Sequence, residues 1–254
     1  MTADGARTIL VTGASGGVGR GIALACGAAG WNVWIAARRA EEGAAVAAEV
    51  TQAGGHGHSI VGDVGDEDSV RRTVEAISAS NGRLDGVVHN ATSGKSSQSG
   101  AMTDVTVEDL EDHVRVGTRG FYLLARFAFP LLEAGRGSFV VMTSEAGFEG
   151  KRLLAPYAMV KAQQRALVAI LAREWGPSGV RVNAVGPLAG SPAMDRAFVS
   201  DPTMEARVLG RIPLGRLGDA TTDIGVVVRF LLGDDSRFVT GQTIMADGGS
   251  CPIP

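Results

Sequence analysis

The most specific chemistry in this sequence lies in a tyrosine and a lysine, Tyr157 and Lys161. Side chains four residues apart share one face of a helix. A phenol with a pKa near 10 exchanges protons poorly at neutral pH, and a nearby ammonium favours the phenolate and lowers that pKa. Tyr157 is therefore a candidate acid or base. Ser144, placed after a predicted strand, could hydrogen-bond a carbonyl oxygen as it gains negative charge.

A glycine-rich segment, TGASGGVG at 12–19, is typical of a phosphate-binding turn. A pyrophosphate needs backbone N–H groups and the positive end of a helix dipole nearby, and glycine lets the backbone approach. A glycine turn that only packs is the alternative. The position between a first strand and a first helix favours dinucleotide binding. The residues expected to contact the cofactor here are Gly13, Ser15, Gly17, Val18 and Gly19.

The end of the second predicted strand favours NADP(H), with NAD(H) the less favoured cofactor. An acidic residue there would bind the ribose hydroxyls of NAD, but this chain has Arg38 and Arg39. A charge-assisted hydrogen bond from such a guanidinium to a 2′-phosphate is worth roughly 1.5–3 kcal/mol. A solvated charge pair at the helix entry is the alternative. Arg38, nearer the strand, is the stronger candidate.

Two further strand ends carry polar candidates. Asp63 and Val64 are placed to meet an adenine, and Asn90 and Ala91 to line the floor of the cofactor site. Either pair could equally be turn residues.

The histidines and a basic pair are weaker candidates for chemistry. His56 and His58 lack further metal ligands, so we expect a surface turn and no metal site. His89 and His113 are expected to be packing or surface residues. The pair KR at 151–152 could meet an anionic substrate, although a solvated loop is favoured.

Alternating strands and helices are predicted to position these residues. The predicted strands are 8–11, 33–37, 59–61, 84–89, 138–142, 180–185 and 242–246, and the predicted helices are 18–29, 41–53, 66–80, 107–132, 157–175 and 221–232. A capping pair, Thr106 and Asp109, opens the long fourth helix. The pattern predicts an α/β, Rossmann-like, doubly wound parallel sheet of about seven strands with helices on both faces, forming one domain over 1–254. Ligands bind beyond the carboxyl ends of such strands.

Composition narrows the class of protein. The 254 residues are 45% hydrophobic with a net charge of −3, so nothing points to nucleic acid or a membrane surface. The first seven residues lack the apolar core of a signal peptide, and two cysteines are too few for a disulfide framework. We expect a cytoplasmic protein with free thiols.

The sequence resembles the short-chain dehydrogenase/reductase family over nearly its whole length. The matching segments are TGxxxGxG at 12–19, DV at 63–64, NA at 90–91, Ser144, Tyr157-x-x-x-Lys161, NAV at 183–185, TGQ at 240–242 and DGG at 247–249. The resemblance implies that Tyr157 exchanges the proton with the substrate oxygen and Ser144 holds that oxygen. It also implies that Lys161 lowers the tyrosine pKa and binds the nicotinamide ribose, and that Pro187 and Leu188 contact the nicotinamide.

The resemblance further implies a homotetramer or homodimer formed through the helices at 107–132 and 157–175. The tail and loops resemble those of bacterial β-ketoacyl carrier-protein reductases, and many family members that act on other substrates look the same.

Four positions depart from the family pattern. Gly117 stands where the family usually has an asparagine that supports a water-linked proton path to the lysine; it keeps the carbonyl and loses the side chain. Thr92 and Leu188 replace glycines, which adds bulk near the cofactor. Gly16 replaces a basic residue common in NADP-binding members, so a phosphate would depend more on Arg38.

We therefore expect an NADPH-dependent reductase, reversible as a dehydrogenase, acting on a small ketone, a β-ketoacyl thioester or a secondary alcohol. One alternative is an NADP(H)-binding regulatory module with weak or no catalysis, and another is enoyl reduction. The apolar residues Met194, Phe198, Met204 and Leu209 hint at an apolar substrate, or form the core of a small helix pair.

Overall fold

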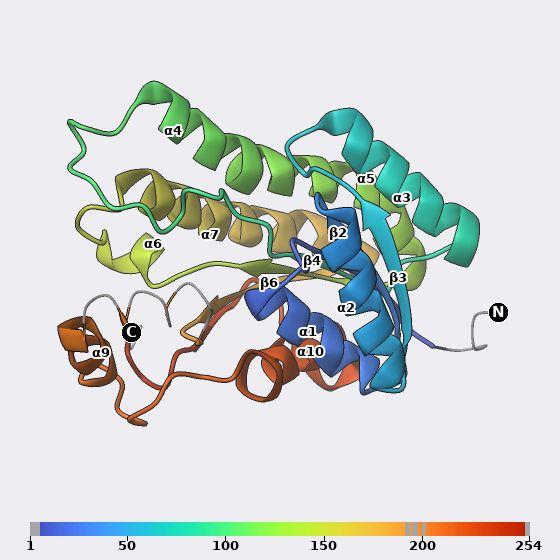
Figure 1. Cartoon of the computed structure of the whole chain (residues 1–254). Coiled ribbons are helices and arrows are strands. Elements are labelled where there is room, and N and C mark those ends of the chain that lie inside the picture. Colours follow the sequence, from blue (N-terminus) through green and yellow to red (C-terminus); the bar gives the residue numbers. More distant parts are fainter. Residues whose placement is uncertain (1–5, 191–193, 195–197, 200–201, 252–254) are drawn as a thin grey trace.

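The computed structural model describes residues 6–190, 194, 198–199 and 202–251 (Figure 1). Seven parallel strands form one sheet in the order β3-β2-β1-β4-β5-β6-β7. Their bounds are β1 (Thr8–Thr12), β2 (Asn32–Ala37), β3 (His56–Val61), β4 (Gly86–His89), β5 (Ser138–Met142), β6 (Arg181–Pro187) and β7 (Thr243–Ala246). The order reverses between β1 and β4, which is where such sheets bind ligands. The predicted fold class is confirmed, and each predicted strand overlaps an observed one, although β3 begins at His56 instead of at 59.

Helices cover both faces of the sheet (Figure 1). One face carries α1 (Gly17–Gly27), α2 (Ala40–Gln52) and α10 (Val226–Leu232), and the other carries α3 (Glu67–Asn81), α5 (Gly120–Gly135) and α7 (Ala155–Trp175). Each face of the sheet has its own hydrophobic core. Side chains along a strand alternate between its faces, so in β1 Leu10 packs in the core with α5 and Ile9 in the core with α1. None of the helices described could span a bilayer.

The shorter elements lie mainly in the connections. They are α4 (Val107–His113), α6 (Ala146–Glu149), η2 (Gly176–Ser178), α9 (Pro202–Leu209) and η4 (Asp234–Ser236). The predicted cap is present, since the Thr106 hydroxyl accepts from the Asp109 N–H at 3.2 Å.

Two predicted helices are interrupted by π-helical turns. The helix predicted at 107–132 is α4, then η1 (Val114–Arg119), then α5. The helix predicted at 221–232 begins as η3 (Ala220–Gly225) and continues as α10. π-turns are local insertions of one residue, which a 3.6-residue hydrophobic period does not reveal, and they frequently occur at functional sites.

The two histidines expected in a surface turn lie in a strand. β3 begins at His56, which pairs with Asn32, and the His58 ring stacks on Trp34 with ring centroids 4.8 Å apart. A Cβ at Gly57 would come within 1.9 Å of the Ala47 carbonyl oxygen, so the glycine between them allows α2 to pack against β3. The turn prediction was wrong because glycine beside histidine was interpreted as a chain reversal instead of a close helix contact.

Candidate active site

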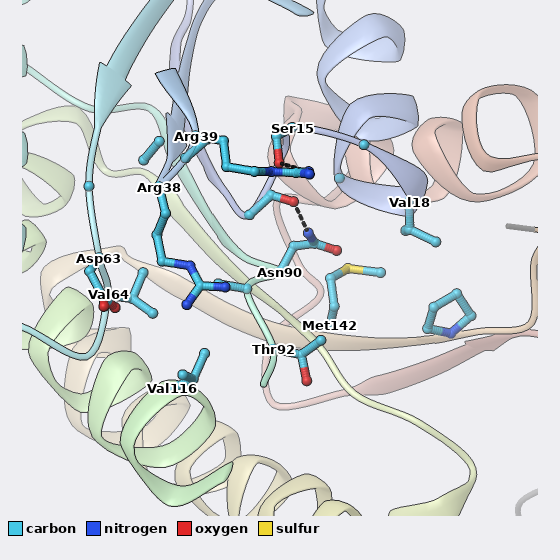
Figure 2. Close-up of a pocket in the computed structure, with 18 of the residues that line it drawn as sticks. Ser15, Val18, Arg38, Arg39, Asp63, Val64, Asn90, Thr92, Val116 and Met142 are labelled. Atoms are coloured by element: carbon cyan, nitrogen blue, oxygen red, sulfur yellow. Dashed lines mark hydrogen bonds between the residues drawn. The ribbon is translucent and has the colours of Figure 1, made fainter. Parts of the chain in front are cut away.

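A cavity of about 510 Å³ opens at the carboxyl ends of β1, β2 and β4 (Figure 2). This volume is in the range of small-molecule and cofactor sites. Its lining includes Gly13, Ser15, Gly16, Val18, Gly19, Arg38, Arg39, Asp63, Val64, Asn90, Ala91, Thr92, Met142, Thr143, Tyr157, Lys161 and Pro187. The predicted residues Gly17, Ser144 and Leu188 do not line it directly.

The glycine-rich turn is clamped against the end of β4. The Asn90 side-chain amide donates to the carbonyls of Thr12 at 3.1 Å and Gly13 at 3.0 Å. Gly13 has a φ of +65°, and a Cβ there would lie 2.7 Å from the Ala91 Cα. A Cβ at Gly19 would lie 2.4 Å from the Asn90 amide nitrogen. Glycine is therefore required at both positions, and Asn90 holds the turn as well as lining the cavity.

The turn presents an open helix N-terminus to the cavity. Helix α1 begins at Gly17 without a side-chain cap and without an acidic residue in its first turn. A Cβ at Gly16 or Gly17 would meet nothing within 4 Å. The N–H groups and the positive end of the α1 dipole are therefore available to an anion. This arrangement fits the pyrophosphate of a dinucleotide.

The two arginines after β2 have different surroundings. Arg39 donates to the Ser15 hydroxyl at 3.2 Å and pairs with Glu42 at 3.1 Å. The Arg38 side chain instead extends into the cavity, toward Asp63 and Val64 (Figure 2). Its guanidinium makes no hydrogen bond or ion pair with the described residues. Arg38 is therefore the arginine that is free to meet a ligand phosphate.

Asp63 is already engaged by protein groups. One carboxylate oxygen accepts from the Gly65 N–H at 2.8 Å, and the other accepts from Arg115 at 2.9 Å. Arg115 also pairs with Asp112 at 3.1 Å. An adenine at this point would meet a carboxylate fixed by η1. Sequence reasoning missed Arg115 because it lies 52 residues from its partner.

Helix α7 carries the tyrosine and lysine to the cavity. The Lys161 ammonium lies 5.4 Å from the centre of the Tyr157 ring. Ser144 follows β5, its hydroxyl accepts from the Ala146 N–H at 3.2 Å, and it hydrogen-bonds the Tyr157 hydroxyl. The structure thus brings Ser144, which follows β5, together with Tyr157 and Lys161, which lie one turn apart on α7.

The expected direction of the tyrosine pKa was wrong. Burial raises the pKa of Tyr157, the hydrogen bond from Ser144 lowers it, and the charge of Glu145 raises it. Burial also lowers the pKa of Lys161 to about 8. Loss of hydration is therefore the largest influence on the pKa of Tyr157. The phenol keeps its proton at neutral pH, which is the form that can protonate a substrate oxygen.

The carbonyl of Gly117 is fully used by protein donors. Gln164 donates its side-chain N–H to this oxygen at 3.0 Å, and the His89 Nε2 lies 3.2 Å from it. A carbonyl oxygen has two lone pairs, so these two contacts fill it. The carbonyl that Gly117 keeps is therefore already bound by protein groups in this structure.

His89 packs as predicted. Its ring is 1% exposed and stacks on Phe121, with centroids 5.8 Å apart. Burial lowers the pKa of His89 to about 3, with a smaller effect from the Lys161 charge, so the ring is neutral at neutral pH. His113 is also buried, with its Nδ1 2.7 Å from the Asp109 carbonyl.

Charged side chains near the mouth of the cavity are paired with one another. Lys151 pairs with Glu145, whose side chain is 10% exposed, and Arg211 lies 3.9 Å from the same carboxylate. Lys151 is therefore not free to meet an anionic substrate, whereas Arg152 is exposed. Sequence reasoning missed Glu145.

Among the described residues, no metal-binding cluster is found, and the apolar candidates for covering a substrate lie outside the cavity lining. In the part of the chain that the structure describes, no three His, Cys, Asp or Glu residues are grouped to hold a metal ion. The apolar residues expected to cover a substrate are half-buried outside the cavity lining: Met194, Phe198, Met204 and Leu209.

The sequence is similar to known oxidoreductases. Residues 13–250 match a family model described as enoyl-(acyl carrier protein) reductase. The 3-oxoacyl-[acyl-carrier-protein] reductase FabG of Staphylococcus aureus is 32% identical over 96% of this chain and 97% of its own length. Glucose 1-dehydrogenase of Gluconobacter oxydans is 33% identical over 96% of this chain and 91% of its own.

Solved structures agree with the sequence relatives. A short-chain type dehydrogenase/reductase from Mycobacterium ulcerans has a TM-score of 0.90 at 33% identity, covering 96% of this chain and 90% of that one. An NAD⁺-bound xylitol dehydrogenase has a TM-score of 0.87 at 28% identity, covering 94% of this chain and 96% of that one. The names of these relatives are those of dehydrogenases and reductases, and where they name a substrate the substrates differ.

Proposed function

Because the chain belongs to the short-chain dehydrogenase/reductase family, we propose that it is an NADPH-dependent reductase of a ketone or β-ketoacyl thioester, reversible on the secondary alcohol. Family membership makes it an oxidoreductase. One observation carries the finer proposal: Tyr157 and Lys161 line the same cavity as an unpaired Arg38.

In this proposal the cofactor, when bound, supplies hydride to the carbonyl carbon. Tyr157 gives its hydroxyl proton to the carbonyl oxygen, which completes the alcohol. The Ser144 hydroxyl hydrogen-bonds the same oxygen as its negative charge grows. The Lys161 ammonium stabilises the phenolate that remains. With its raised pKa, Tyr157 is protonated at neutral pH, which is the form that carbonyl reduction requires.

The choice of cofactor rests on Arg38, since the relatives do not decide it. One solved relative, a xylitol dehydrogenase, is NAD⁺-bound, so the shared fold does not by itself select NADP(H). Arg38 stands where NAD-binding proteins of this architecture carry an acidic residue, and its guanidinium is free. Arg39 would assist at a greater distance, through its contact with Ser15.

The remaining predicted contacts complete the proposed cofactor site. The pyrophosphate would lie on the N-terminus of α1, against Gly13, Ser15, Gly17, Val18 and Gly19. The adenine would lie between Asp63 and Val64, and the nicotinamide near Asn90, Ala91, Pro187 and Leu188. Leu188 does not line the cavity itself, and its N–H donates to the Ala246 carbonyl at 3.0 Å. In this proposal it would support Pro187, which does line the cavity.

A second candidate function is an NADP(H)-binding module with little catalysis. The observation that favours it is the Gly117 carbonyl, which two protein donors already fill. After each turnover, Tyr157 would then have to regain its proton from the cavity, without a relay through the Gly117 carbonyl.

The test is loss of NADPH absorbance, with NADH measured in parallel, against acetoacetyl thioesters and a panel of apolar ketones. Binding of each cofactor is measured separately by fluorescence titration. Turnover with NADPH at least about tenfold above NADH supports the reductase, since about 1.4 kcal/mol of phosphate recognition gives that ratio. Tight NADPH binding with no turnover of any ketone would favour the binding module. Equal use of both cofactors would refute the role of Arg38.

A further inference from the structure

A side chain outside the recognised motifs holds the buried end of Lys161. Gln164 lies three residues further along α7 and is 0% exposed. Its side-chain oxygen accepts from the Lys161 ammonium at 3.2 Å, and its nitrogen donates to the Gly117 carbonyl at 3.0 Å. Both ends of a buried amide are thus satisfied, and the amide links α7 to η1.

The packing of η1 on α7 explains why this contact must come from α7. A Cβ at Gly117 would lie 2.3 Å from a methyl group of Val160, which is a stiff, β-branched side chain. No side chain fits at position 117 while Val160 keeps its place. Any polar group that reaches the lysine from this side therefore has to be carried by α7.

The hydrogen bonds of Lys161 leave one N–H for the cavity. Two protons of the ammonium go to the Met142 carbonyl at 2.7 Å and to Gln164. The third is left for the cavity, which Lys161 lines. The titratable groups facing it are Tyr157 on α7 and His89 at the end of β4, and both are neutral at neutral pH.

We infer that Gln164 is a positioning residue for Lys161: its amide keeps the buried ammonium charged and directed at the cavity, a task that Gly117 has no side chain to perform. An acceptor beside a buried cation offsets part of the cost of burial, because it favours the charged form. The catalytic consequence rests on the proposed reductase function, but the effect on Lys161 does not.

Nuclear magnetic resonance can follow Lys161 directly, because the chain has only three lysines, Lys95, Lys151 and Lys161. In protein labelled with ¹³C-lysine, the ε-carbon shift of Lys161 is expected to titrate near pH 8. Gln164→Leu removes the acceptor, so the midpoint should fall by roughly one pH unit, since a hydrogen bond to a charged group offsets at least that much. Gln164→Glu places a negative charge beside the ammonium and should raise the midpoint.

The neighbouring glutamine provides the matched control. Gln163 is exposed and its side-chain oxygen accepts from the Thr118 hydroxyl at 2.7 Å, away from Lys161. Gln163→Leu should leave the Lys161 midpoint unchanged. Circular dichroism and size-exclusion chromatography check the fold and assembly of every variant. If Gln164→Leu does not fold, the Lys161 midpoint in Gln164→Glu tests the inference by itself. This variant keeps the side-chain volume and an acceptor.

Opposite shifts in the two Gln164 variants support the inference, and a wild-type midpoint in either folded variant overturns it. In the active enzyme, Gln164→Leu should lower kcat roughly tenfold while KM for the ketone stays within about twofold, because an interaction of the reacting groups is lost. The titration needs neither cofactor nor turnover. A wild type that reduces no ketone but shows the shifts would refute the proposed function and leave the role of Gln164 standing.

Discussion

Two adjacent arginines show how surroundings separate residues of one type. Arg38 extends into the cavity without a partner, whereas Arg39 is held by Ser15 and Glu42. Arg38→Ala should weaken NADPH binding about ten- to a hundredfold and leave NADH binding nearly unchanged, because only the 2′-phosphate contact is lost. Arg39→Ala, the matched control, should have a smaller effect. Fluorescence titration of both cofactors measures this, and equal losses for NADPH and NADH would contradict it.

Tyr157 carries the proposed proton transfer, so its hydroxyl is the sharpest target for mutation. Tyr157→Phe keeps the ring beside Lys161 and removes only the acid. We expect kcat to fall by about a hundredfold or more, with NADPH affinity kept within about threefold. Steady-state assays and cofactor titration separate the two effects. A Phe variant that still reduces ketones at the wild-type rate would show that another group supplies the proton.

The residues that spacing could identify are those in short motifs after strands. Tyr157 and Lys161 are one turn apart, and the glycine turn is contiguous, so both can be recognised along the chain. Their roles remain predictions. Arg115 was missed because its partner Asp63 lies 52 residues away. Gln164 was missed because its burial and its contact with Gly117, 47 residues away, exist only in the folded chain. The pKa of Tyr157 was also missed, since burial is a property of the folded molecule.

At the scale of elements, the central strands β1, β2, β4 and β5 were predictable because each is a short, mainly apolar run whose residues are all buried, whereas β3 is polar and partly exposed, and its first three residues were not predicted. The π-turns η1 and η3 were not, because each is stabilised by contacts with another helix. Gly117 lets η1 approach Val160, and a Cβ at Gly21 would lie 2.4 Å from the backbone of Ala220 in η3. Hydrophobic periodicity records which face of a helix is buried and contains no information about such approaches.

The turn between β1 and α1 can be tested with two glycines of the same segment. Gly19→Ala would place a Cβ 2.4 Å from the Asn90 amide and 2.7 Å from the Gly13 carbonyl. It should destabilise the protein by about 1–3 kcal/mol, as overpacking does, and weaken NADPH binding as the turn shifts. Gly16→Ala meets nothing within 4 Å and should change stability by about 0.5 kcal/mol or less. Urea denaturation and NADPH titration check this, and equal effects would contradict it.

At the scale of the whole molecule, helices α5 and α7, which lie on the face of the sheet opposite α1, expose large apolar side chains that are not part of the core. Tyr122 on α5 is 54% exposed, and Ile170 and Met159 on α7 are 47% and 42% exposed. On this side, an exposed hydrogen bond between Thr118 and Gln163 joins η1, which leads into α5, to α7. Tyr122 is one turn beyond Thr118, and Met159 one turn before Gln163, so these side chains fall on neighbouring helix surfaces. Exposed apolar surface of this kind favours association.

The proposed homotetramer or homodimer is expected to use this α5–α7 face. Light scattering after size exclusion should give the wild type a mass of two or four chains. Tyr122→Glu combined with Ile170→Glu should reduce that mass, because burying unpaired carboxylates in an apolar contact costs several kcal/mol. Gln52→Glu, on the exposed surface of α2, is the control and should keep the wild-type mass. A double variant with the wild-type mass would place the interface elsewhere, and a monomeric wild type would refute the assembly itself.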